Sequence, residues 1–185
     1  MAIFNWILVG SWAAFLITWS STAWRNKPTM RGSPAAGLGI AGFSVFVILL
    51  HFILPRLPTS LVALPPSFVR GTLGSILCVI GIAYAIRARV SLGSNWGLPM
   101  SRKERPQLIT SGPYARVRHP IYAGVVLALL GSAIVTGIAL LLVALAMSAF
   151  FLIGAFREER HLRTEFPEGY PAYQARTKRF IPFLF

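Results

Sequence analysis

Charged side chains are scarce in this chain of 185 residues, since only 12% of its residues are Asp, Glu, Lys or Arg while 55% are hydrophobic. A soluble domain of this length needs a charged surface to cover its core, and so few charges cannot provide one. The scarcity excludes an ordinary soluble domain. It predicts an integral membrane protein that forms a single domain over residues 1–185.

Cysteine is almost absent, because Cys78 is the only one and it lies within an apolar run. A single cysteine excludes an intrachain disulfide and a cysteine-based metal cluster. The three histidines also lack the spacing of metal ligands: His51, His119 and His161. We therefore predict no metal site and expect Cys78 to be a core residue.

Acidic residues are few, with five against 18 Lys and Arg and a formal net charge of +13. In a soluble protein this excess would indicate a nucleic-acid partner. Beside apolar segments it has another explanation, because cytoplasmic flanks of membrane helices are rich in Lys and Arg and anionic headgroups attract them. We expect membrane lipids, and no nucleic acid, as partners.

Long apolar runs are abundant, and about 20 residues suffice to span the hydrocarbon core. Three runs have this length: Ala2–Trp24, Ala35–Leu54 and Ser67–Ile86. Basic residues rather than a small-residue cleavage site follow the first run, which predicts a retained helix and not a signal peptide. Residues 1–86 therefore form three amino-terminal spans.

A fourth run, Pro120–Phe156, contains 37 residues without Lys, Arg, Asp, Glu or His, which is about enough for two helices. We expect a turn near Thr136 and Gly137, with Gly131 and Ser132 as the alternative. The sequence thus predicts an all-α integral membrane protein of about five transmembrane helices, the last two forming a tight helical hairpin.

The distribution of charge predicts the orientation. Five spans place residues 25–34, 87–119 and 157–185 on one side, together with 16 of the 18 Lys and Arg residues. The positive-inside rule assigns this side to the cytoplasm. We expect the amino terminus outside, and the carboxyl terminus and a cytoplasmic cofactor pocket within the catalytic half, residues 87–185.

The segment before the hairpin concentrates polar residues at a helix start. Arg118 and His119 precede Pro120, a residue suited to a first helical turn, and free amides there can bind an anion. The alternative is that both cations snorkel to the interface while Tyr114 and Tyr122 belong to an aromatic belt.

Glu158 and Glu159 follow the last apolar run, where carboxylates oppose the helix dipole. Two explanations remain open. One is a set of salt bridges with the nearby arginines Arg157, Arg160 and Arg163. The other is recognition of a cationic ligand by paired carboxylates in a semi-buried pocket.

Four groups of residues in the carboxyl-terminal half form one pattern: Leu108–Tyr114, Arg118–Gly124, Glu158–Leu162, and Phe166, Tyr170, Tyr173, Arg176 and Pro182. The pattern resembles that of the isoprenylcysteine carboxyl methyltransferase and phospholipid methyltransferase superfamily of membrane enzymes. The resemblance implies the cofactor S-adenosylmethionine, with S-adenosylhomocysteine as product. It implies cofactor contacts at Leu108, Tyr114, His119, Tyr122, Glu158 and Glu159.

The resemblance also names catalytic candidates: Arg118, Arg176 and Glu158. The two arginines match residues near the acceptor and could hold a carboxylate in bidentate geometry. An isoprenylcysteine-like carboxylate needs no general base, whereas a phospholipid amine must first lose a proton, for example to a glutamate. We favour the carboxylate, because Arg176 and the closing residues 180–183 are similar to that branch.

Two rival functions are distinct in mechanism. Membrane sterol reductases look similar around the Arg-His segment but bind a nicotinamide cofactor, and their chains are much longer. A non-enzymatic scaffold or transporter subunit could bind anionic lipid through basic loops. A transporter, however, is expected to place ionisable groups near the bilayer midplane, and these spans hold mainly His51.

Overall fold

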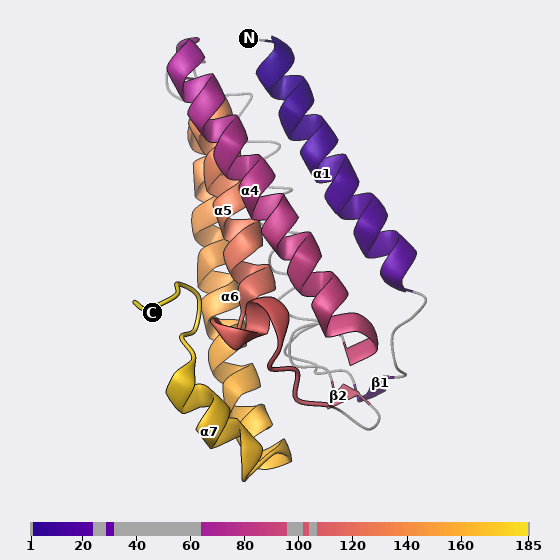
Figure 1. The fold of residues 1–185 in the computed structure, drawn as a ribbon. Helices are drawn as coiled ribbons and strands as arrows, with labels where there is room; N and C mark the ends of the chain where they lie inside the picture. The colour runs from indigo at the N-terminus through magenta and orange to yellow at the C-terminus, as the bar shows by residue number, and fades with distance from the viewer. Residues whose placement is uncertain (1, 24–28, 32–63, 96–101, 104–106, 185) are drawn as a thin grey trace.

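The fold is helical in a computed structural model that describes residues 2–23, 29–31, 64–95, 102–103 and 107–184. The described helices are α1 (Ala2–Ala23), α4 (Phe68–Leu92), α5 (Pro120–Thr136), α6 (Ile138–Glu165) and α7 (Gly169–Arg176). The long helices run side by side, and the amino terminus and α7 lie at opposite ends of the bundle (Figure 1).

Three described helices are long and apolar enough to cross a membrane: α1, α4 and α6. The apolar helix α5 is shorter, with 17 residues. The expected span Ala35–Leu54, with His51, lies outside the described residues. Helix α4 continues past the predicted end at Ile86 to Leu92. These helices confirm an integral membrane protein.

A single residue, Gly137, separates α5 from α6 and has a φ of 128°. Residues that carry a side chain rarely adopt such a backbone conformation, so glycine permits the one-residue break. The turn expected near Thr136 and Gly137 is confirmed. The alternative at Gly131 and Ser132 is wrong, because both residues lie inside α5.

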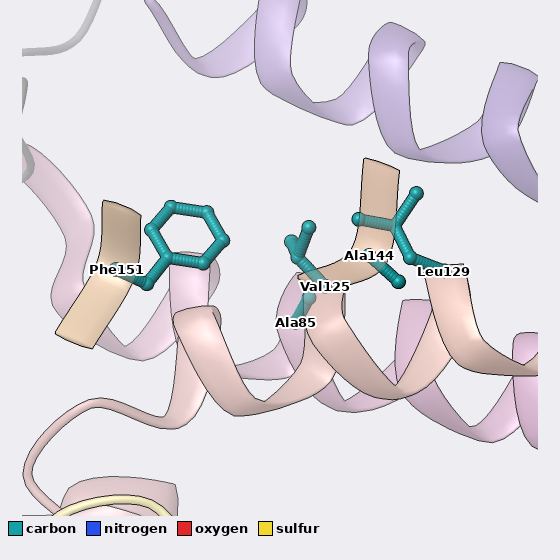
Figure 2. Packing of buried hydrophobic residues seen from close by; sticks show 5 residues of the cluster. All are labelled: Ala85, Val125, Leu129, Ala144 and Phe151. Atoms are coloured by element: carbon teal, nitrogen blue, oxygen red, sulfur yellow. The ribbon is translucent and has the colours of Figure 1, made fainter. Parts of the chain in front are cut away.

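Packing between α5 and α6 is that of an antiparallel hairpin. One buried cluster joins Val125 and Leu129 of α5, Ala144 and Phe151 of α6, and Ala85 of α4 (Figure 2). Residues of α5 that lie near the turn thus pack against residues of α6 near the turn, and residues of α5 farther from the turn pack against residues of α6 that are also farther from it. The cluster fixes how the polar ends of the two helices meet.

Helices α4 and α5 approach until their backbones touch. A Cβ atom added at Gly81 would lie 2.5 Å from the amide nitrogen of Ala128, and one added at Gly124 would lie 2.7 Å from the carbonyl oxygen of Gly81. Close packing through small residues is a principal source of helix association in membranes. Cys78 is fully buried in this region, as expected for a core residue.

Helix α1 packs against α4 along its length. Near its start, the ring of Phe4 covers Gly71. At the other end, the buried Arg89 of α4 donates hydrogen bonds of 3.0 Å to the carbonyl of Thr22 and 2.7 Å to that of Gly93. A charge placed between two helix ends thereby joins them.

Two short strands, β1 (Thr29–Arg31) and β2 (Arg102–Lys103), pair in antiparallel orientation. The pairing joins the segment after α1 to the segment before α5. Both belong to the basic loops expected on one side. Two 3-10 turns, η2 (Gly93–Asn95) and η3 (Gly112–Ala115), lie in the same connection between α4 and α5.

Candidate active site

The chain immediately before α5 is hydrogen-bonded to the segment that follows α7. The amide of Arg118 donates to the carbonyl of Lys178 at 2.8 Å, and that of His119 donates to Arg179 at 3.0 Å. The amide of Lys178 donates back to Arg116 at 3.1 Å. This backbone pairing brings two segments about 60 residues apart in sequence to the start of one helix.

Glu159 of α6 is the centre of a buried ionic network. Its carboxylate accepts a hydrogen bond of 2.9 Å from Nε of Arg118 and two of 2.9 Å from Nε and Nη2 of Arg179. Only 4% of the Glu159 side chain is exposed. A buried carboxylate is tolerated when it is paired and fully hydrogen-bonded, and Glu159 meets that condition.

Helix α7 adds a further layer to this network. Nε2 of Gln174 donates to Glu159 at 3.4 Å, and Nη1 of Arg118 donates to the carbonyls of Gln174, at 3.3 Å, and Thr177. Arg163 donates to the side-chain oxygen of Gln174 at 3.0 Å. Glu159 thus forms salt bridges, but with arginines from two other segments.

His119 lies between the two glutamates. Its Nε2 is 3.3 Å from Glu159 and its Nδ1 is 3.5 Å from Glu158. Burial alone lowers the pKa of the imidazole, but hydrogen bonds to Glu158 and Glu159 outweigh burial, so the pKa is raised above its ordinary value. The geometry favours an imidazolium between two carboxylates.

Glu158 differs from its neighbour in exposure and partners. The hydroxyl of Tyr122 donates to Glu158 at 2.7 Å, and 24% of the glutamate side chain is exposed. Glu159 faces the protein interior while Glu158 reaches the surface of the site. Of the pair, Glu158 is therefore the carboxylate that a ligand can approach.

Aromatic rings form a stack beside these carboxylates. Tyr122 lies parallel to His119, with centroids 5.4 Å apart, and parallel to Phe151, with centroids 4.3 Å apart. Phe180 packs against His119 at 5.7 Å. Stacked aromatic faces next to a carboxylate form a surface that attracts a cation.

The stack borders a cavity of about 770 Å³ between α4, η3, α5, α6 and the closing segment. Tyr122, Phe151 and Phe180 line one part of it, and Tyr84, Arg87 and Arg116 line another. Apolar side chains of α5, α6 and the closing segment form much of the remaining wall. The volume lies within the range typical of small-molecule sites.

Not every residue expected in the site gathers there. Arg118, His119, Tyr122, Glu158 and Glu159 form one connected cluster. The remaining three, Leu108, Tyr114 and Arg176, lie outside this hydrogen-bonded cluster.

Tyr114 packs in a buried cluster that includes Tyr122, and its carbonyl accepts a hydrogen bond of 2.8 Å from Tyr173. Leu108 lies against Gly169 at the start of α7. Arg176 is exposed, with its guanidinium 5.9 Å from the ring centroid of Tyr173. Burial raises the pKa of Tyr173 to about 12, so its phenol remains a hydrogen-bond donor.

Sequence reasoning missed Arg179, Gln174 and Phe151. Arg179 could have been inferred from the need of a buried glutamate for a cationic partner. Gln174 and Phe151 carry no comparable signal, because a glutamine in a polar helix and a phenylalanine in an apolar one are ordinary residues there.

Comparison with known proteins supports one assignment. The family model described as phospholipid methyltransferase matches residues 69–169, more than half of the chain. The cobalt-zinc-cadmium resistance protein CzcN of Cupriavidus metallidurans is 32% identical over 111 residues, which cover 58% of this chain and 49% of CzcN. The chain therefore spans about half the length of that relative.

Among solved structures, the fold is similar to that of the eukaryotic intramembrane Ras methyltransferase ICMT (isoprenylcysteine carboxyl methyltransferase), with a TM-score of 0.56 and 24% identity. The match covers 83% of this chain and 54% of that protein. Because the family model matches more than half of the chain, the chain belongs to the phospholipid methyltransferase family, and its fold is similar to that of ICMT.

Proposed function

We propose that this protein transfers a methyl group from S-adenosylmethionine to a lipid-embedded acceptor and releases S-adenosylhomocysteine. One observation carries the proposal. An accessible glutamate, Glu158, is hydrogen-bonded to Tyr122 of an aromatic stack, and that stack lines a large cavity beside the membrane helices. Membership of the methyltransferase family supports it.

The residues at this place suit the chemistry of the cofactor. S-adenosylmethionine carries a sulfonium and an ammonium cation, which a carboxylate and aromatic faces stabilise. Glu158, His119 and Tyr122 would hold these groups, with Leu108 and Tyr114 as further cofactor contacts. Glu159 would act indirectly, because its carboxylate is used to hold Arg118, His119 and Arg179. When bound, the cofactor supplies an electrophilic methyl carbon.

Methyl transfer from sulfur is an in-line displacement, so the protein's task is to align the acceptor and exclude water. The buried network would keep the start of α5 and the closing segment rigid during this alignment. The apolar cavity would admit the hydrocarbon part of the acceptor from the membrane, while the cofactor arrives from the cytoplasmic side. No proton transfer is needed if the acceptor is a carboxylate.

Our first candidate for the acceptor is an isoprenylcysteine-like carboxylate. Among the described residues, Arg118 uses Nε and Nη1 for its hydrogen bonds, which leaves Nη2 to bind that carboxylate. Arg176 is the second arginine we propose for the acceptor. The test that separates this role from a structural one is a rise in KM for the acceptor, without a fall in thermal stability, in Arg176→Gln.

A phospholipid amine is the second candidate, and the accessible carboxylate of Glu158 favours it. An ammonium acceptor must lose a proton before it attacks, and Glu158 is placed to take one. Incubation with labelled cofactor and each acceptor in turn would distinguish O-methylation from N-methylation by the product formed.

Calorimetric binding of S-adenosylmethionine and S-adenosylhomocysteine to the detergent-purified protein tests the proposal, with NADPH as the control ligand. We expect saturable binding of both sulfur ligands, with about −8 kcal/mol if Kd is near 1 μM. Tight binding of NADPH alone would instead support a reductase. Absence of binding by a folded sample would support a non-enzymatic scaffold.

A further inference from the structure

Two arginines of the cavity differ from the others near the site. Arg87, near the end of α4, and Arg116, just after η3, both line the cavity and are exposed. Within the described part of the chain, neither guanidinium has an ion pair or a hydrogen bond. Arg118 and Arg179, by contrast, are both bound to Glu159. Among the described residues, Arg87 and Arg116 are therefore charges without a protein anion.

The backbone holds both arginines in fixed places. Arg87 is part of α4, whose neighbours Ala85 and Ala88 are fully buried. The amide of Arg116 donates to Pro113 at 3.3 Å, and its carbonyl accepts from Lys178 at 3.1 Å. Tyr84 lines the same cavity and lies within electrostatic range of both guanidinium groups. Two cations and a phenol thus gather at one part of the cavity.

The rest of the cavity is suited to hydrocarbon. Val126, Leu127 and Leu130 of α5 and Leu152 of α6 line it. A site with guanidinium groups in one part and aliphatic side chains in the other complements an amphiphile that carries an anionic group on an apolar chain. A neutral lipid would leave the two charges unmatched.

We propose that Arg87 and Arg116 bind the anionic group, carboxylate or phosphate, of an amphiphile whose hydrocarbon occupies the cavity, and that this amphiphile is the methyl acceptor. The inference rests on the proposed function. It identifies residues that recognise the acceptor apart from Arg118 and Arg176, and it restricts the substrate class to lipids that carry an anionic group.

A carboxylate and a phosphate bound by these two arginines would have different roles in methyl transfer. A carboxylate held here would itself form the new O–C bond as the C–S bond breaks and its electron pair stays on sulfur. The carboxylate would become a neutral ester and lose its attraction to the arginines, which assists release. A phosphate would remain charged throughout and would instead hold the lipid while its amine reaches toward Tyr122 and Glu158.

Equilibrium binding in dodecyl maltoside tests the proposal with three probes: N-acetyl-S-farnesylcysteine, its uncharged methyl ester, and phosphatidylethanolamine. The first carries an anionic carboxylate and the last is a zwitterion with an anionic phosphate, so these two serve as the anionic probes. For the anionic probe or probes that use the site, we expect Arg87→Gln and Arg116→Gln each to weaken binding about tenfold, as for loss of a charge-assisted hydrogen bond. Binding of the uncharged ester and of S-adenosylmethionine should stay within twofold of wild type. The matched control is Arg160→Gln, which removes an exposed arginine of α6 outside the cavity.

The two anionic probes identify the source of the anion. If the variants weaken binding of the farnesylcysteine alone, the anion is a carboxylate. If they weaken binding of the phospholipid alone, it is a phosphate. If they weaken binding of both, the site accepts either anion. The proposal is overturned if the double variant binds both anionic probes within twofold of wild type. If wild-type protein fails to bind S-adenosylmethionine, the proposed function fails, while anionic-probe binding still tests the two arginines.

A second measurement covers the case of a variant that does not fold. Binding of an anionic probe to the wild-type protein should weaken as salt rises, because ions screen the exposed guanidinium groups, whereas binding of the uncharged ester should not. Equal salt dependence for the ester and both anionic probes would contradict the proposal without any substitution.

Discussion

Arg179 donates two hydrogen bonds of 2.9 Å to the two carboxylate oxygens of Glu159. The pair joins the closing segment of the chain to α6, and the hydrogen bonds raise the pKa of Arg179 above its ordinary value. Phe180, the next residue, packs on His119 and lines the cavity. A buried ion pair therefore holds one wall of the candidate active site in place.

We predict that Glu159→Gln destabilises the protein strongly. The substitution leaves Arg118 and Arg179 without their carboxylate in a buried place, and breaking such a pair typically costs about 3–5 kcal/mol. Thermal unfolding in detergent, followed by far-ultraviolet circular dichroism, measures the effect. The closing segment should also become accessible to protease.

Glu168→Gln is the matched control, because this glutamate is exposed and its side chain makes no capping hydrogen bond to α7. We expect its melting temperature to equal that of the wild type within error. Equal stability of both variants would mean that the Glu159 network contributes nothing to the fold.

A second prediction concerns pH. The pKa of His119 is raised in the folded protein, so the imidazolium contributes stability that is fully present below the unfolded pKa of about 6.5 and is lost as pH rises through the folded pKa. The melting temperature of the wild type should therefore fall as pH rises across that window. The fall should be smaller in His119→Gln, whose amide can donate to one carboxylate but does not titrate.

His161→Gln is the matched control, because it removes an exposed histidine of α6 that lies 3.9 Å from Glu165 and outside the buried network of Glu159. A His119→Gln profile that parallels the wild type over the window would contradict the assignment of the charge to His119.

The hairpin could be predicted from the sequence because its evidence is local. A long run without charge requires two helices, and a glycine within it permits the turn at Gly137. The same holds for the start of α5 at Pro120. The motif along the chain also names Arg118, His119, Tyr122 and Glu158, whose side chains the structure brings into one cluster, while their functional roles stay predictions.

The partner of Glu159 could not be predicted in the same way. Nearby arginines on α6 were the natural candidates from sequence distance, yet the structure uses Arg118 and Arg179. Their selection depends on the backbone pairing of residues 116–119 with 178–179, which is a tertiary contact without a local pattern. The same reason applies to Arg87 and Arg116. From the sequence they contribute only to the excess of positive charge on one side of the membrane, and the structure shows that both line one cavity.

We predict that Gly81→Ala disrupts the contact between α4 and α5. The added Cβ would lie 2.5 Å from the backbone nitrogen of Ala128, and no flexible side chain can move aside to relieve it. Overpacking of this kind typically costs about 1–3 kcal/mol. The melting temperature in detergent should fall, and the cavity beside α5 should bind cofactor and lipid more weakly.

Gly10→Ala is the control for helix propensity, because a Cβ at Gly10 of α1 would have no described atom within 4 Å apart from the adjoining backbone of its own helix. This variant should be as stable as the wild type or more so, since alanine favours the helix over glycine. A Gly81→Ala protein with unchanged stability would show that the two helices can separate without penalty.

The hydroxyl of Tyr122 should act on the cofactor only through Glu158. Tyr122→Phe keeps the ring stacked on His119 and Phe151 but removes the 2.7 Å hydrogen bond to the carboxylate. A hydrogen bond to a charged group contributes about 1.5–3 kcal/mol, so we expect affinity for S-adenosylmethionine to fall about ten- to 100-fold with little change in melting temperature.

Calorimetry on Tyr122→Phe, Glu158→Gln and the double variant forms a double-mutant cycle. The double variant should bind no more weakly than Glu158→Gln alone. Additive losses would instead mean that Tyr122 contacts the cofactor independently, and that its bond to Glu158 does not position the carboxylate.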